Sequence, residues 1–207
     1  MTVIKMTGFW KDSTKKVPTH FLDFLNYAGV ISYQKKLKQI KILVSPDLPQ
    51  IPKNIYIDPA RPFSNIIWIK RVLSECSDFI YWMDKHFHKV ALDWLWSTAD
   101  SNRIRKIRIL SLSSTGNNNV NKDTKKTYLH FKQEMKNKGI EVIWSVIDST
   151  EMRDSHDRWI IGGNNYLLNL PNVNAIASGQ RSEINHSDNY KDSLRAFETY
   201  WTKSQEL

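Results

Sequence analysis

The stretch HDRWIIGG, residues 156–163, places a histidine and an arginine two residues apart at the start of an apolar run. Residues two apart in a β-strand point to the same side, so His156 and Arg158 can face a single anion. An imidazole and a guanidinium together suit a phosphate group. A second interpretation stays open, in which His156 is a strand-edge side chain bonded to a neighbour and Asp157 pairs with Arg158 or a nearby lysine.

Apolar residues around this stretch recur at two spacings, which predict helices and strands in alternation. Steps of three and four residues predict helices at 20–28, 64–76 (with Ser64 as the N-cap), 88–96, 125–138 and 189–203. Short apolar runs and alternating patterns predict strands at 40–44, 54–57, 79–83, 104–112, 140–147, 156–161, 165–169 and 173–177. This order predicts an α/β fold, in which a mixed β-sheet is flanked by helices on both faces.

The length and charge of the chain limit its organisation and its partners. The 207 residues are enough for one well-buried core and short for two full domains. We expect an N-terminal extension of uncertain structure at 1–60 and one main domain at 61–207. The net charge of +9 favours polyanionic partners such as nucleic acid or an acidic membrane surface. The lysines at 35–41 fit a solvated face and a phosphate-tracking surface equally well.

Several classes of site are disfavoured by the residues that the chain lacks. Cys76 is the only cysteine, which excludes an intramolecular disulfide and a cysteine-based zinc cluster, and its place on an apolar helix face predicts a buried thiol. His86 and His88 have the spacing of half a metal site but no matching ligands, so we expect no metal and no cofactor. We find no secretory signal and no apolar run of about 20 residues, and therefore expect a cytoplasmic protein.

The element order over about residues 64–204, together with His156-Asp157-Arg158, resembles one half of the phospholipase D superfamily. The resemblance is closest to the divergent branch that includes the phospholipase-D-like C-terminal domain of MIT-domain proteins and bacterial relatives, in which His-Asp-Arg replaces His-x-Lys. It implies that His156 is a catalytic nucleophile that forms a phosphohistidine, and that Arg158 clamps the phosphate. The polar tract Ser178, Gly179 and Arg181 would supply further phosphate contacts.

The chain also departs from the pattern of that superfamily. Gly163 stands where the family has an acidic residue. One motif is present, so chemistry with two histidines requires a homodimer that brings two copies of His156 together. We consider Asp84 and His86, at the end of a predicted strand, and Glu183 as accessory groups. The carboxylates near the motif can equally form surface ion pairs with neighbouring arginines.

These observations favour a phosphodiester-handling protein, with a nuclease-like domain that acts on nucleic acid without a metal. The basic residues Arg103, Arg105, Lys106 and Arg108, on and before a strand that we expect to have a basic outer edge, would contact the nucleic-acid backbone. An alternative is a catalytically inactive module that binds nucleic acid, acidic lipid or a partner protein. A third is a subunit of a larger assembly.

Overall fold

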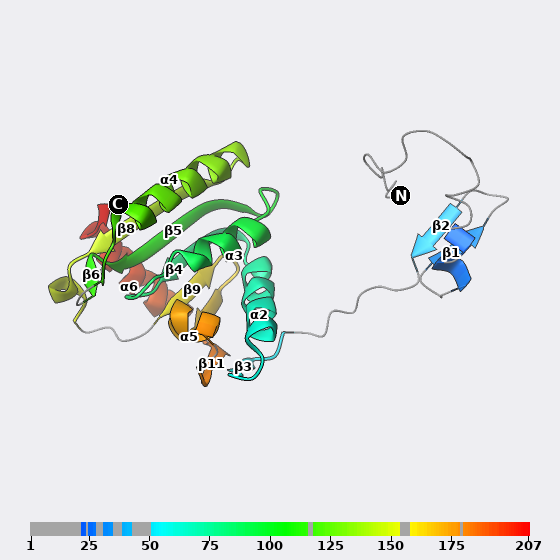
Figure 1. Ribbon diagram of the computed structural model, residues 1–207, viewed down its shortest axis with the longest axis horizontal. Coiled ribbons are helices and arrows are strands. Elements are labelled where there is room, and N and C mark those ends of the chain that lie inside the picture. The colour runs from blue at the N-terminus through cyan, green and yellow to red at the C-terminus, as the bar shows by residue number, and fades with distance from the viewer. Residues whose placement is uncertain are drawn as a thin grey trace. The chain divides into compact units, whose positions relative to one another are not determined.

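The computed structural model describes residues 22–23, 25–27, 31–34, 39–42, 51–115, 118–153, 158–178 and 180–207. The chain divides into two compact units, Met1–Gln50 and Ile51–Leu207. In the first unit, β1 (Ile31–Gln34) pairs with β2 (Gln39–Ile42) in antiparallel fashion, and residues 22–23 and 25–27 of the helix expected at 20–28 are helical. The second unit holds the main sheet (Figure 1). It begins at Ile51 and includes β3 (Asn54–Ile57), which we had expected within the N-terminal extension.

The described part of the second unit contains a mixed eight-stranded sheet with the order β12-β8-β5-β4-β9-β10-β11-β3. Its central strands β4, β5 and β8 are parallel, and the other neighbours are antiparallel. The strands after β3 are β4 (Asp78–Met83), β5 (Ile104–Leu112), β8 (Glu141–Ile147), β9 (Trp159–Gly162), β10 (Tyr166–Asn169), β11 (Ser182–His186) and β12 (Gln205–Glu206). A separate two-stranded hairpin joins β6 (Ser114–Thr115) to β7 (Asn118–Asn119).

Helices cover both faces of this sheet, which confirms the α/β prediction (Figure 1). They are α2 (Pro62–Glu75), α3 (Val90–Thr98), α4 (Lys122–Asn137), α5 (Val173–Ser178) and α6 (Tyr190–Thr202). Successive residues of a strand point to opposite faces, so Trp82 packs in the core under α2 to α5 while Met83 packs in the core under α6. Each fully buried side chain of this size contributes about 1.5–3 kcal/mol by leaving water.

The core beneath α3 and α4 also fixes the loop that follows β4. Phe87 packs edge-on against Trp82 and Trp144, with ring centroids 5.3 and 4.9 Å apart. The indole N–H of Trp144 donates to the Ser111 hydroxyl at 2.9 Å, which satisfies this buried donor. The loop after β4 is therefore anchored in the core through its middle residue.

The structure corrects three local predictions. Residues 173–177 form the helix α5 instead of a strand, because the Asn172 side chain caps it by accepting the Ala175 N–H at 2.6 Å. The helix expected from Ser64 begins at Pro62, a residue suited to a first helical turn. The strand at 104–112 has no free outer edge, because β5 lies between β4 and β8.

Other predicted elements are confirmed at or near their expected bounds. β3 and β5 occupy 54–57 and 104–112 as predicted, and α6 fills all but the ends of 189–203. Cys76 is buried, as its helix face predicted, and burial raises the pKa of its thiol to about 12. The helix expected from residue 88 begins at Val90, so His86 and His88 precede α3.

Candidate phosphate-binding site

The sheet topology brings the ends of four strands to one edge, which we call the carboxyl edge. The parallel strands β4, β5 and β8 end there, and the antiparallel strand β9 begins there. Met83 at the end of β4 pairs with Trp159 at the start of β9, so the residues that flank them, Asp84 and Arg158, are neighbours in space. Carboxyl edges of α/β sheets are where ligands commonly bind.

Asp84 is a buried carboxylate that joins three segments. Its Oδ1 accepts the Arg158 Nε–H at 3.0 Å and the His86 backbone N–H at 2.9 Å, and its Oδ2 accepts the Val173 N–H at 3.0 Å. The side chain is completely buried. Burial raises the pKa of Asp84, and the two backbone N–H groups and Arg158 oppose this rise by stabilising the charged form. Asp84 thereby ties the end of β4 to the starts of β9 and α5.

Arg158 is held at the carboxyl edge by two hydrogen bonds. It donates to Asp84 through Nε, and its backbone carbonyl accepts the Leu170 N–H at 3.0 Å. The side chain is 23% exposed, although the carboxylate that it binds is inaccessible. Among the described residues the two terminal nitrogens make no hydrogen bond, so they are the donors that this side chain keeps for a ligand. Two parallel N–H groups of this kind match the oxygens of a phosphate.

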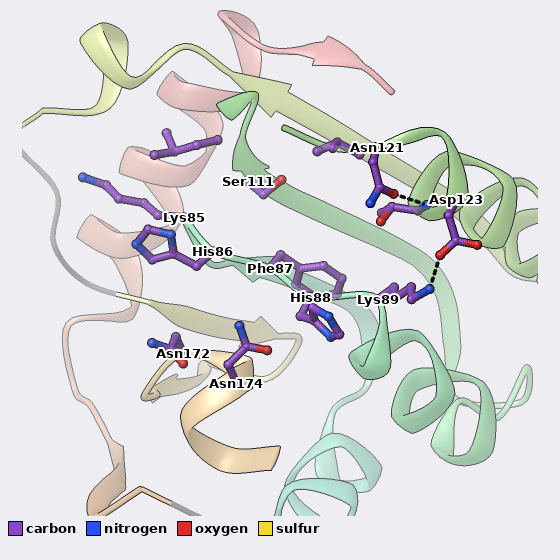
Figure 2. A pocket seen from close by; sticks show the side chains of 13 residues that line it. Lys85, His86, Phe87, His88, Lys89, Ser111, Asn121, Asp123, Asn172 and Asn174 are labelled. Atoms are coloured by element: carbon purple, nitrogen blue, oxygen red, sulfur yellow. Dashed lines mark hydrogen bonds and ion pairs between the residues drawn. The ribbon is translucent and has the colours of Figure 1, made fainter. Parts of the chain in front are cut away.

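A polar cavity of about 330 Å³ lies at the same edge (Figure 2). One wall is the loop from Lys85 to Lys89, which directly follows Asp84. The other walls come from the end of β5 at Ser111, from Asn121 before α4, and from Asn172 and Asn174 beside the start of α5. Lysine, histidine and asparagine side chains from three of these segments, together with Ser111 from β5, thus surround the cavity.

The remaining candidate residues from the sequence lie in different places. His156 and Gly179 lie outside the described residues, and Ser178 is the last residue of α5. Arg181 is exposed just before β11, and Glu183 is exposed on β11, which is separated from β9 by β10. Within the described ranges, no hydrogen bond or ion pair joins either of these two residues to Arg158. Their proposed roles remain predictions.

Gly163 lies at the end of β9 opposite to Arg158, in a place without room for a side chain. Its N–H donates to the Ser77 carbonyl at 2.8 Å. A Cβ atom at Gly163 would lie 2.7 Å from that carbonyl oxygen and 2.5 Å from Oδ2 of Asp78. An acidic residue at this position would force the backbone apart. The packing around Gly163 therefore excludes the acidic residue that the superfamily has at this position.

Three of the four basic residues expected to contact nucleic acid are engaged within the fold. Arg108 donates to both carboxylate oxygens of Glu198, at 2.9 and 3.1 Å. Lys106 pairs with Glu141 at 3.0 Å, and Arg103 donates to the Cys76 carbonyl at 2.7 Å. Glu141 and Glu198 thus neutralise Lys106 and Arg108, whereas Arg103 remains exposed. Contact of these residues with nucleic acid stays a prediction. Arg105 is exposed.

The described residues contain neither a recognisable metal cluster nor a membrane-spanning helix. No group of three or more histidine, cysteine or acidic side chains with metal-binding geometry occurs among them. No helix in that part of the chain is both long and apolar enough to cross a membrane.

The sequence matches no family model and no curated protein. Among solved structures the chain is similar to TrmBL2, an archaeal chromatin protein that shows a novel mode of DNA binding, with 13% identity, a TM-score of 0.50, and coverage of 91% of this chain and 82% of that one. It is also similar to NucT from Helicobacter pylori (13% identity, TM-score 0.49, 75% of this chain and 99% of that one). Polyphosphate kinase from Porphyromonas gingivalis matches at 12% identity and a TM-score of 0.41, over 73% of this chain and 26% of that one. At these identities, the likeness to TrmBL2 concerns the α/β fold alone.

Proposed function

We propose that the protein binds the phosphodiester backbone of nucleic acid at the carboxyl edge and cleaves it there. The observation that carries the proposal is the arrangement of Arg158, which a buried carboxylate holds through Nε while its terminal nitrogens bind none of the described residues. A guanidinium fixed in this way can bind two non-bridging oxygens with little loss of side-chain freedom. The net charge of +9 would attract a polyanion to the protein.

The resemblance to the phospholipase D superfamily supplies the proposed chemistry. His156 attacks phosphorus, so that a P–N bond forms and the P–O bond to the leaving nucleotide breaks. A second imidazole, which we assign to His156 of the partner subunit in a twofold dimer, gives a proton to the leaving oxygen. That imidazole then takes a proton from water, which attacks phosphorus and breaks the P–N bond. Arg158 neutralises the charge on the phosphate oxygens throughout.

Nucleic acid as the partner is compatible with what one protein of similar fold binds. TrmBL2 is a chromatin protein that binds DNA, and the similarity covers most of both chains. Other polyanions share the same charge, so acidic lipid serves as the comparison in the experiment below.

A second candidate function is binding without cleavage. The close contact of Gly163 with Ser77 and Asp78 favours it, because the chain cannot hold the acidic residue that the superfamily has at this position. Arg158 would bind phosphate in this case too. The two functions therefore share a ligand and differ in the role of His156.

Labelled single- and double-stranded DNA and RNA, incubated with the protein in the presence of EDTA, test the proposal. We expect metal-independent cleavage that falls at least about a thousandfold in His156→Ala, because a nucleophile is lost. The matched control is His130→Ala, an exposed histidine on α4, which should cleave like the wild type. Light scattering should find a dimer.

Each other outcome has a definite meaning. If the wild type and His156→Ala are equally inert but bind DNA or RNA with a steep salt dependence, the protein has the second function. If the protein binds no nucleic acid and floats with acidic liposomes, both functions are wrong.

A further inference from the structure

We propose that the cavity at the carboxyl edge binds a second phosphate of the same nucleic-acid strand, next to the phosphate on Arg158. This inference rests on the proposed function, and it extends the site from one phosphate of the strand to two. A nucleic acid carries one negative charge per nucleotide, so a strand fixed at Arg158 must place a neighbouring phosphate close by. A preformed site for that second phosphate would lengthen the contact between the protein and the strand and would fix the orientation of the strand.

The cavity and Arg158 share one anchor. Lys85 and His86 follow Asp84 directly, and the His86 N–H donates to its carboxylate. Asn172 precedes Val173, whose N–H binds the other oxygen of the same carboxylate. Asp84 thus fixes two walls of the cavity as well as the Arg158 guanidinium.

Three neutral polar side chains of the cavity each have an acceptor atom occupied by a backbone N–H group. Asn121 Oδ1 accepts the Thr124 N–H at 2.8 Å, at the start of α4, and Asn172 Oδ1 accepts the Ala175 N–H in α5. His88 Nδ1 accepts the Val90 N–H at 3.3 Å, at the start of α3. What these residues keep for a ligand is donors: two amide NH₂ groups and the Nε2–H of a neutral imidazole. A wall of donors suits an acceptor-only ligand such as phosphate.

The charged side chains of the cavity favour the same ligand. Lys85 and Lys89 both line it. Asp123 is the one carboxylate among the described lining residues, and Lys89 binds it, which lowers the pKa of Asp123. Lys85 has no carboxylate partner in the described part of the chain, and its backbone carbonyl accepts the Leu112 N–H at 3.3 Å. Helix α4 begins at Lys122, and the positive end of its dipole adds to the positive potential of the cavity.

The volume and rigidity of the cavity are suitable for a specific subsite. About 330 Å³ lies within the range of roughly 300–1,000 Å³ that is usual for small-ligand pockets, and holds a phosphate with part of its nucleotide. Phe87 packs between Trp82 and Trp144 and holds the Lys85–Lys89 loop in place. Little reorganisation is then needed when the strand binds.

The sharpest test replaces a donor with a charge while keeping the helix cap. Asn121→Asp retains an oxygen that caps α4 and is a favourable N-cap residue, but it presents a carboxylate to the cavity. We expect it to weaken binding of a short labelled single strand about tenfold at low salt, measured by fluorescence anisotropy. The matched control is Asn137→Asp, which adds the same charge at the other end of α4 and should leave affinity within about twofold.

A second variant measures the number of phosphates directly. Lys85→Ala should lower the slope of log K against log salt concentration by about 0.7, the value for one phosphate contact with a single strand. The control Lys136→Ala, an exposed lysine in the last turn of α4, should keep the wild-type slope. A dinucleoside monophosphate, which has a single phosphodiester, should bind Lys85→Ala and the wild type equally.

The results separate this inference from the function on which it rests. If Arg158→Ala loses binding while Asn121→Asp and Lys85→Ala bind like the wild type, the second phosphate site is wrong and the proposed function stands. If Arg158→Ala binds like the wild type, or no variant or wild-type protein binds the strand, the proposed function fails and the second site fails with it. Loss of strand binding in Asn121→Asp and a reduced slope in Lys85→Ala, with both controls unchanged, establish the second site.

Discussion

Two arginines of similar exposure are held in opposite ways on two parts of the sheet. The Arg108 side chain is 19% exposed and the Arg158 side chain 23%. Arg108 lies on the α6 face, gives Nη1 to both oxygens of Glu198, and has its guanidinium 4.9 Å from the ring centres of Tyr81 and Trp201. Arg158 lies at the carboxyl edge and is bound through Nε.

The difference shows why exposure and charge alone do not identify a ligand-binding arginine. Arg108 binds Glu198 through its terminal nitrogen Nη1, and its guanidinium stacks on the Tyr81 ring. A ligand of Arg108 would therefore have to displace a carboxylate. Arg158 binds Asp84 through its inner nitrogen Nε, and its terminal nitrogens bind none of the described residues. Arg108 therefore has a structural role in the fold, whereas the binding role of Arg158 is the one that we propose.

The largest expected effect is the loss of nucleic-acid binding in Arg158→Ala. We expect affinity for a short single strand to fall about a hundredfold, because hydrogen bonds to a charged group are each worth about 1.5–3 kcal/mol. Arg158→Lys should lose about tenfold, since an ammonium keeps the charge but lacks the fork geometry and the inner nitrogen. Fluorescence anisotropy at fixed salt measures both. Arg108→Ala is the matched control, and an equal loss of affinity in it would erase the distinction between the two arginines.

The second effect concerns stability and should belong to Arg108. Arg108→Ala removes a partly buried ion pair and the contacts with two aromatic rings, so we expect the free energy of unfolding in urea to fall by about 2 kcal/mol. The exposed Arg105 on the same strand provides the comparison, because Arg105→Ala should change stability by less than about 0.5 kcal/mol. A change of that small size in Arg108→Ala would mean that the stacked guanidinium contributes nothing to the fold.

The smallest effect concerns Asp84, the carboxylate that holds Arg158, instead of Arg158 itself. Asp84→Asn keeps the shape of the side chain but removes the charge that holds Arg158, so we expect affinity to fall about tenfold. In a cleavage assay the loss should appear mainly in KM, since Asp84 acts through Arg158 and does not touch the substrate. Glu198→Gln, the equivalent change beside Arg108, should leave affinity unaltered. Wild-type affinity in Asp84→Asn would show that Arg158 needs no anchor.

Local patterns in the sequence predicted much of the fold. β5 alternates and runs between turn residues, and α6 carries aromatic and apolar residues at helical steps, so both were predicted near their true bounds. The pattern at 173–177 failed, because Val and Ile in a short run also suit a strand, and the groups that cap α5 include Asp84, far away in the chain. β12, Gln205–Glu206, carries no apolar pattern and exists through its pairing with β8.

The candidate site was predicted in part. The sequence placed Arg158 at a strand start and Asp84 at a strand end, but it gave no sign that they form a pair, because that depends on which strands are neighbours. Of the cavity residues, His86 and His88 were singled out from the sequence, and the others were missed for a similar reason. Lys85–Lys89, a basic segment directly after a predicted strand, was the available signal, whereas Asn121 and Asn172 acquire their roles only through the helices that they cap.

The most direct test of the central claim is an NMR titration of ¹⁵N-labelled protein with a short single strand. We expect the Nε–Hε signal of Arg158 and the backbone N–H signals of Lys85–Lys89 and Val173 to shift together and to saturate at one ligand concentration, while the Nε–Hε signal of Arg108 stays in place. Shifts that gather around Arg108 and α6, with Arg158 unmoved by saturating ligand, would contradict it.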